Sequence, residues 1–236
     1  MLKADLHLHS KEDAMDPHIT YSAKDLIDRA AQLNFNMLAF TFHNQLFWKE
    51  ELITYAEKKG IMLIPGSEMI IEGKDVLVYN LTKQTFNDIT SFEDLKRAKE
   101  KDRNIFVIAP HPYFPGNRSL GKALEKHINL FDAIEYSWFH SSLINFNQKA
   151  VRIAKKHNKP LIATSDCHHL PLFGKNYIIA NSSHPRRIGT VIRKGRCKNT
   201  IAPLSTIKLI YHGVRIIYKS FTTRRQKAKS INTAKI

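Results

Sequence analysis

Short apolar runs of strand character alternate along the chain with longer amphipathic segments of helical periodicity, and this alternation constrains the fold most strongly. Strands are predicted at 3–8, 37–41, 62–64, 76–79, 105–109, 133–136, 161–164 and 177–180. Helices are predicted at 22–33, 48–59, 92–101, 120–127 and 144–157. Such alternation indicates βαβ units and a largely parallel sheet, and 236 residues suffice for one barrel-like α/β domain with a short appendage. One pair departs from this pattern, because Glu72-Gly73-Lys74-Asp75 is typical of a hairpin turn and predicts that strand 76–79 is antiparallel to the one before it.

The first predicted strand carries two histidines two residues apart. Side chains alternate across a strand, so His7 and His9 share one face while Leu6 and Leu8 share the other. Two imidazoles on one face favour a metal ion. Taken alone, the pair is also compatible with two hydrogen-bonded histidines near a barrel mouth.

Residue types that bind metals also follow the ends of later predicted strands. They are His43, Glu68, His111, Asp166 and His168. In an α/β barrel, the loops after the strands converge at the carboxyl-terminal face and form the active site there. Imidazoles and carboxylates are the usual ligands of Zn, Mn and Fe. Five histidines and two carboxylates are too many for one ion, so two or three divalent metal ions are predicted.

Five motifs that contain these residues resemble those of a known family. The motifs are Asp5-Leu6-His7-Leu8-His9-Ser10, Thr41-Phe42-His43-Asn44, Gly66-Ser67-Glu68, His111-Pro112 and Ser165-Asp166-Cys167-His168. In this order, over roughly residues 1–185, they are similar to the motifs of the PHP (polymerase and histidinol phosphatase) superfamily. The resemblance implies a distorted (β/α)7 TIM-like barrel with a di- or trinuclear metal centre that hydrolyses phosphate esters. It implies that His7, His9, Glu68 and Asp166 hold one metal, that Glu68 bridges to a second, and that His43, His111 and His168 complete the neighbouring sites.

Two positions depart from the family pattern. Phe42 stands where the family usually has Asp, and Met15 stands where it tends to have Asp or His. Asp13 and Asp16 lie close to Met15, and Asp16 is the preferred substitute ligand, with a solvated loop acid as the alternative. His140 falls near where the family often offers a further histidine ligand, and an ordinary loop histidine is an equal alternative.

The predicted activity is hydrolysis of a phosphomonoester or phosphodiester by a metal-activated water, with Glu68, Asp166 and His168 in the catalytic centre. Arg118, in the loop after His111, is a candidate for contact with the substrate phosphate, or an ordinary loop residue. Two alternatives remain open. One is an amidohydrolase-type metal hydrolase, disfavoured by Glu68 and by the Asp166-x-His168 pair. The other is a degenerate metal-binding or regulatory module, suggested by Phe42 and Met15.

Charge is distributed unevenly along the chain. Residues 1–166 hold 22 Lys and Arg against 21 Asp and Glu, whereas residues 167–236 hold 15 Lys and Arg and no acidic residue. We therefore predict a domain at 1–185 and a basic helical extension at 186–236, which includes an amphipathic helix over 204–221 and a disordered tail. This extension predicts contact with nucleic acid or with an anionic membrane surface. The alternative is a helix docked on the domain with a solvated basic fringe.

Other features predict a cytoplasmic protein, with peripheral binding to an anionic membrane surface as a further option. No apolar run reaches the length of a membrane span, and the charged N-terminal segment does not resemble a secretory signal peptide. Cys167 and Cys197 provide neither a disulfide framework nor a zinc spacing.

Overall fold

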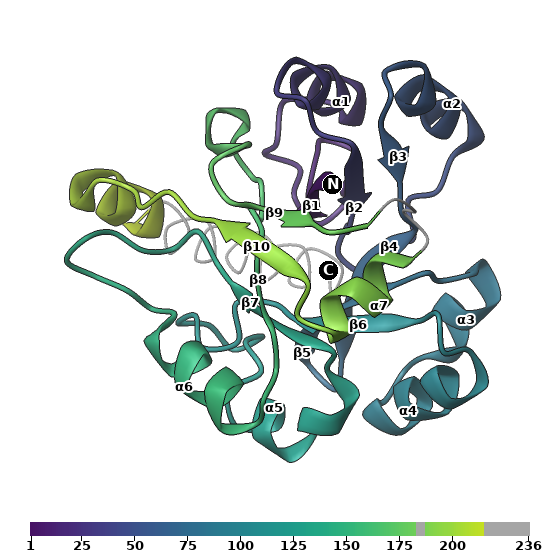
Figure 1. Cartoon of the computed structure of the whole chain (residues 1–236), viewed down its shortest axis with the longest axis vertical. Helices are drawn as coiled ribbons and strands as arrows, with labels where there is room; N and C mark the ends of the chain where they lie inside the picture. Colours follow the sequence, from purple (N-terminus) through teal and green to yellow (C-terminus); the bar gives the residue numbers. More distant parts are fainter. Residues whose placement is uncertain (183–186, 215–236) are drawn as a thin grey trace, which may run out of the picture. The chain divides into compact units, whose positions relative to one another are not determined.

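The computed structural model describes residues 1–182 and 187–214 (Figure 1). They divide into two compact units, one of residues 1–138 and 146–202 and one of residues 139–145 with those from 203 onward. The predicted domain boundary at residue 185 falls inside the first unit, which also contains the following helix and strand. The predicted helix start at Ser183-His184-Pro185, the helix beyond 214 and the disordered tail lie outside the described residues.

The first unit is an α/β fold with two mixed five-stranded sheets. The first sheet has the order β10-β9-β1-β2-β3, formed by Cys197–Thr200, Tyr177–Ala180, Leu2–Leu8, Met37–Phe40 and Met62–Leu63. The second has the order β4-β5-β6-β7-β8, formed by Gly66–Ile71, Lys74–Tyr79, Phe106–Ala109, Ala133–Tyr136 and Leu161–Ala163. Parallel pairing joins β1, β2 and β3, and also β6, β7 and β8. The predicted antiparallel hairpin is confirmed, because β4 pairs antiparallel with β5.

A closed barrel, which the resemblance implied, is not confirmed. Among the described residues the ladders form two separate sheets, and isolated bridges run between His43 and Glu68 and between Leu8 and Cys167. The edge strands β3 and β8 have two and three residues, too few to continue a ladder. On the other edge of β8, the Asn199 side chain of β10 accepts from Ala163 N–H and donates to the Leu161 carbonyl, so one side chain replaces a strand pairing.

Helices lie outside the strands of the first unit (Figure 1). They are α1 (Ala23–Gln32), α2 (Glu50–Lys58), α3 (Lys83–Asp88), α4 (Phe92–Lys101), α5 (Lys122–Lys126), α6 (Gln148–Lys156) and α7 (Ile188–Arg193), with 3-10 turns at Ile128–Leu130 and Leu170–Leu172. Ser22 and Ser91 begin α1 and α4 with capping boxes. The sequence prediction missed α3, β10 and β4, so Glu68, which was predicted to follow a strand, lies inside β4. It began α6 four residues early, and residues 144 and 145 belong to the second unit. No helix within the described ranges is long and apolar enough to cross a membrane.

Three apolar clusters form the core. One of them combines residues from both sheets, including Leu6 and Met37 from the first and Tyr79 and Phe106 from the second. The rings of Tyr79 and Phe106 stack at 4.3 Å, and the Tyr79 hydroxyl donates to the Leu6 carbonyl at 2.7 Å. The core thereby joins the two sheets and supports the strand ends on which the polar residues lie.

Candidate metal centre

The structure gathers most of the residues predicted as ligands at the ends of the strands. His7 lies in β1 and Glu68 in β4, and the others come from loops that follow β1, β2, β6 and β8. The residues brought together are His7, His9, Asp16, His43, Glu68, His111, Asp166 and His168. The structure therefore brings these predicted residues together from both sheets, and their role as metal ligands stays a prediction.

Four of these side chains form what we call the inner group: His7, His9, Glu68 and Asp166. Glu68 Oε2 lies 3.3 Å from His7 Nε2 and 3.4 Å from His9 Nε2. Asp166 Oδ1 lies 3.4 Å and 3.5 Å from the same two nitrogens. Ligands bound tetrahedrally at about 2.1 Å from an ion are about 3.4 Å apart. These four distances therefore match a tetrahedral site, and the ligand atoms of His7, His9 and Asp166 all lie within 4.8 Å of one another.

Hydrogen bonding supports the same interpretation. His9 Nε2 and Asp166 Oδ1 are buried and make no hydrogen bond of normal geometry among the described residues, although charged neighbours lie 3.3–3.5 Å away. A buried polar atom without a partner is costly, and an ion between the two would satisfy both. The inner group thus fits a divalent cation.

Glu68 lies at the centre of the cluster. Its Oε2 is 3.1 Å from His43 Nε2, and its Oε1 is 3.0 Å from His111 Nε2. The side chain is 1% exposed, so burial would raise its pKa, but His43 and His7 hold that pKa well below its usual range. The carboxylate is therefore ionised, and its two oxygens face different imidazoles, as a ligand shared by two ions requires.

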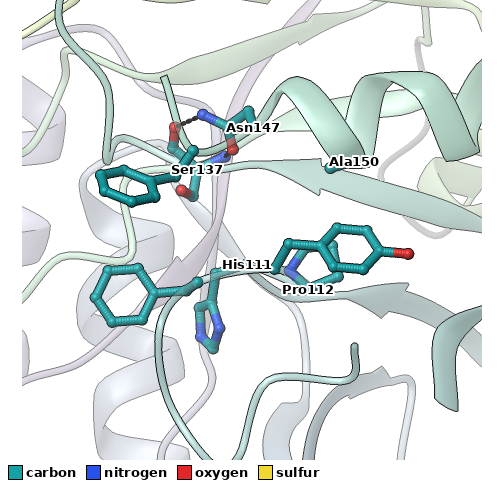
Figure 2. A pocket seen from close by; sticks show the side chains of 8 residues that line it. His111, Pro112, Ser137, Asn147 and Ala150 are labelled. Atoms are coloured by element: carbon teal, nitrogen blue, oxygen red, sulfur yellow. Dashed lines mark hydrogen bonds between the residues drawn. The ribbon is translucent and has the colours of Figure 1, made fainter. Parts of the chain in front are cut away.

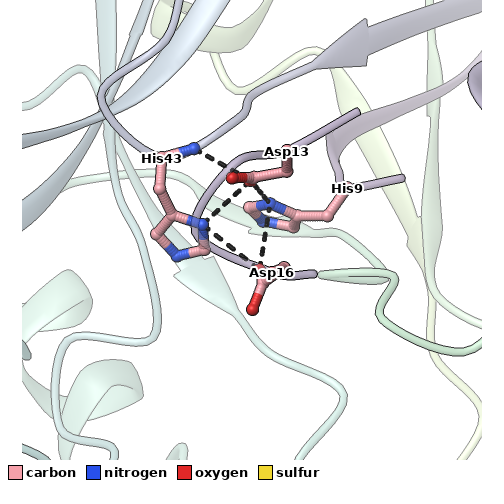
Figure 3. A group of neighbouring side chains, drawn as sticks. All are labelled: His9, Asp13, Asp16 and His43. Atoms are coloured by element: carbon pink, nitrogen blue, oxygen red, sulfur yellow. Dashed lines mark hydrogen bonds and ion pairs between the residues drawn. The ribbon is translucent and has the colours of Figure 1, made fainter. Parts of the chain in front are cut away.

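A second set, which we call the outer group, consists of His9, Asp13, Asp16 and His43 (Figure 3). Asp13 Oδ2 lies 2.9 Å from His9 Nδ1 and 3.0 Å from His43 Nδ1, and it accepts from the His43 backbone N–H at 3.0 Å. Asp16 Oδ2 lies 3.3 Å from His43 Nδ1 and 2.9 Å from His168 Nε2. The sequence prediction preferred Asp16, whereas the structure gathers both carboxylates and buries Asp13 fully.

Glu135 on β7 was missed by the sequence analysis. Its Oε1 lies 2.7 Å from His7 Nδ1, and its Oε2 accepts from the His111 backbone N–H at 2.6 Å. The Thr164 hydroxyl also donates to Oε1. Because Glu135 occupies Nδ1 of His7, it orients Nε2 toward the inner group. An acidic residue within the buried strand Ala133–Tyr136 was the signal that could have identified it.

Asp5 on β1 supports the site from the backbone side. Its Oδ1 accepts from the N–H groups of His7 at 3.4 Å and of Ser165 at 3.1 Å. Burial raises the pKa of Asp5 to about 7. This fully buried side chain links β1 to the loop that carries Asp166.

Two of the gathered residues have a strained backbone. His111 has φ 25° and Asp166 has φ 43°, in a region that side chains with a Cβ rarely adopt. Such strain costs about 1–3 kcal/mol and concentrates at functional sites. The strain places both side chains where they reach His7.

The imidazoles are electrostatically coupled to the carboxylates. Burial alone would lower the pKa of His43, but Glu68, Asp13 and Asp16 raise it to about 10. Burial alone would also lower the pKa of His111, but the Glu68 carboxylate outweighs this effect and raises that pKa to about 9. Protons therefore balance the carboxylate charge in the metal-free protein, and divalent ions could replace them.

Three further positions that the sequence analysis singled out are not members of the inner or the outer group. His140 belongs to the second unit, where it bridges to Asn145, so its assignment as a ligand stays a prediction. Arg118 is 44% exposed, with Nη1 3.7 Å from Asp75 Oδ1. Phe42, where a carboxylate was expected, packs its ring 4.6 Å from that of Phe47 in the apolar core.

A narrow pocket lies beside His111 (Figure 2). Pro112, Tyr113, Phe114, Ser137, Phe146, Asn147 and Ala150 complete its lining. Asn147 shapes it by accepting from Ser137 N–H and donating to the Ser137 carbonyl, both at 2.9 Å. Aromatic rings therefore flank the centre on this side.

Comparisons with known proteins agree with the motif resemblance. The family model described as the PHP domain matches residues 5–169, and one described as PHP-associated matches residues 145–197. An uncharacterized protein of Methanocaldococcus jannaschii is 24% identical over 127 residues, 51% of this chain and 73% of its relative.

Solved structures share the fold. A two-domain Bacteroides vulgatus protein, described as containing a predicted PHP-like metal-dependent phosphoesterase, has TM-score 0.62 and 18% identity, covering 85% of this chain and 64% of that one. PsfC from Pseudomonas syringae has TM-score 0.61 and 18% identity, covering 93% and 98%. An amidohydrolase from Chromobacterium violaceum, with bound sulfate and no metal, has TM-score 0.53 and 16% identity, covering 70% and 87%. At these identities the likeness is one of fold alone.

Proposed function

The chain belongs to the PHP domain family, matched from residue 5 to residue 169, and we propose that it is a metal-dependent hydrolase of phosphate esters. The spacing of the inner group carries this proposal, with its two buried polar atoms that lack a hydrogen-bond partner. His7, His9, Glu68 and Asp166 would hold one ion. Glu68 with His111, and the outer group with His168, would hold one or two more. When bound, divalent ions of the Zn, Mn or Fe type lower the pKa of water and neutralise phosphoryl oxygens.

The chain's own residues would then orient the substrate and the ligands. Glu135 fixes the orientation of His7, and Asp5 fixes the backbone that carries His7 and Ser165. His168, 27% exposed and held by Asp16 and Asp166, lies at the rim of the cluster. His168 is therefore proposed to act in the catalytic centre as a ligand of the outer ion, with its imidazole oriented by Asp16 and Asp166.

Arg118 is proposed to contact the phosphate. On the β4–β5 hairpin Ile70 pairs with Asp75 and Glu68 pairs with Leu77, so Asp75 shares one face of the hairpin with Glu68. The ion pair with Asp75 therefore places the Arg118 guanidinium beside that face.

The experiment combines metal analysis with a substrate panel. Purified protein is loaded with Mn or Zn and assayed on generic phosphomonoesters, phosphodiesters and amides, together with Asp166→Asn and a matched control, Asp88→Asn, on the exposed end of α3. We expect hydrolysis of a phosphate ester by the wild type and by Asp88→Asn, and loss of both bound metal and activity in Asp166→Asn.

Three outcomes would contradict the proposal. Full activity of Asp166→Asn would exclude the inner group as the reaction centre. Hydrolysis of amides alone would favour the amidohydrolase alternative. Stoichiometric metal without hydrolysis of any ester would favour a degenerate metal-binding module.

A further inference from the structure

The described part of the second unit contains a short helix with one buried side. Residues 206–214 are helical, and this helix contacts the segment 139–145 of the same unit. Leu209 is 2% exposed, and the Thr206 hydroxyl donates to Ser141 Oγ at 3.3 Å. A Cβ at Gly213 would lie 3.2 Å from the Phe139 ring, so helix and segment approach closely there.

Another side of this helix is apolar and exposed. Ile207, Ile210, Tyr211 and Val214 are 82%, 55%, 59% and 60% exposed. Their spacing of i, i+3, i+4 and i+7 places them along one face, which we call the exposed stripe. Its four members contrast with the buried Leu209, although all lie within nine residues. A contiguous apolar surface of this kind marks an interaction site.

Positive charge accompanies the exposed stripe. Lys208 follows Ile207 and is exposed. In the sequence, the apolar spacing continues through Ile217 and Phe221, and basic residues recur at Arg215 and Lys219. From residue 203 to residue 236 the chain has eight Lys or Arg and no Asp or Glu. Any partner that fits this segment combines an apolar layer with negative charge.

An apolar stripe next to basic residues favours one of the two partners predicted from the sequence over the other. Nucleic acid is bound through cations on phosphates and through aromatic or polar contacts to bases, and it gives aliphatic side chains no apolar phase. An anionic bilayer offers acyl chains for isoleucine and valine, a headgroup layer for tyrosine, and phosphates for lysine and arginine. We propose that the second unit docks on an anionic membrane surface, with the exposed stripe in the interface and Lys208 at the headgroups.

The test uses the full chain and vesicles. Binding is measured by cosedimentation with vesicles of phosphatidylcholine alone or with about 30% phosphatidylserine, at low and high salt. We expect binding to the anionic vesicles that weakens with salt. The triple variant Ile207→Ser, Ile210→Ser, Val214→Ser should bind on the order of tenfold more weakly. The matched control Trp48→Ser, Met62→Ser, Val151→Ser removes three exposed apolar side chains of the first unit and should bind like the wild type.

Circular dichroism and the melting temperature report whether the triple variant remains folded. Vesicle binding needs no catalysis, so this test is independent of the proposed function. Three results would overturn the proposal: no binding to anionic vesicles, equal binding by the triple variant, or tight binding to DNA or RNA that the triple variant retains. A stripe-dependent dimer that binds no vesicles would also overturn it, in favour of a second copy of the chain.

Discussion

The inner group and the outer group differ in what satisfies their polar atoms. In the inner group, His9 Nε2 and Asp166 Oδ1 are buried without a hydrogen-bond partner. In the outer group, Asp13 is within 3.0 Å of two imidazoles and a backbone N–H, and Asp16 is 2.9 Å from His168. An ion at the inner group supplies interactions that are missing, whereas an ion at the outer group must displace hydrogen bonds already made. We therefore expect the inner group to bind its ion more tightly.

The largest effect is expected from Glu68→Gln, which removes the charge shared by both groups. Four imidazoles lose their common carboxylate, and removing one partner of a buried ion pair costs about 3–5 kcal/mol. The metal-free variant should lose about that much free energy of unfolding in a urea titration, and it should bind no ion stoichiometrically. Asp88→Asn serves as the control. Retention of both ions would show that Glu68 is not shared.

A smaller effect, confined to the inner group, is expected from Glu135→Gln. The amide cannot accept the His7 Nδ1 proton as a carboxylate does, so His7 loses its charged partner and part of its orientation. Changes of this kind lower metal affinity by about 10–100-fold. Competition with a fluorescent chelator measures the affinity of the variant and of the wild type for the inner ion. If the variant instead bound the outer ion more weakly and the inner ion as tightly as the wild type does, Glu135 would act on the outer group.

Raising the pH should strengthen metal binding at the outer group, which contains His43, and at the position formed by Glu68 and His111. The pKa values of about 10 for His43 and about 9 for His111 lie above the 6.5 of an unfolded chain, so these protons must leave before an ion binds. Affinity should rise by up to about tenfold per pH unit for each displaced proton between pH 7 and pH 9. Calorimetry in buffers of different ionisation enthalpy counts the protons.

The same raised pKa values affect the stability of the metal-free protein. Stability from these imidazoles is fully present below pH 6.5 and is lost as the pH rises through 9 to 10, because the folded state then binds more protons than the unfolded state. Between pH 6.5 and pH 10, the melting temperature of the protein freed of metal by a chelator should therefore fall more than that of the metal-loaded protein. Equal slopes would mean that ions do not replace these protons.

The smallest effect is expected from Asp16→Asn. The amide oxygen can still face His168 and an ion, so only charge is lost. The affinity of the outer ion should fall by less than about tenfold, or about 1.4 kcal/mol, with the inner ion unchanged. Metal titration monitored by calorimetry separates the two steps. A loss of the inner ion would show that the two groups are not independent.

The sequence was sufficient to identify those candidate ligands that lie in strands or next to strand ends. Glu68, His111, Asp166 and His168 follow or occupy recognisable strands, and motif order places them on one face. It failed where a side chain acts through another residue. Glu135 carries no motif signal and is recognisable only by its 2.7 Å approach to His7, 128 positions away in the chain. Asp13 and Asp16 could not be ranked, because loop geometry decides which carboxylate faces inward.

The sequence by itself determined the α/β class, the hairpin at Glu72-Gly73-Lys74-Asp75 and which polar residues follow strands, because local periodicity and residue type suffice for these. Only the tertiary structure decided the rest. Pairing between edges depends on strand lengths, so two short edge strands left two sheets instead of a closed barrel. Hydrogen bonding depends on distances between remote side chains, so only packing left His9 Nε2 and Asp166 Oδ1 without partners and gave the outer carboxylates theirs.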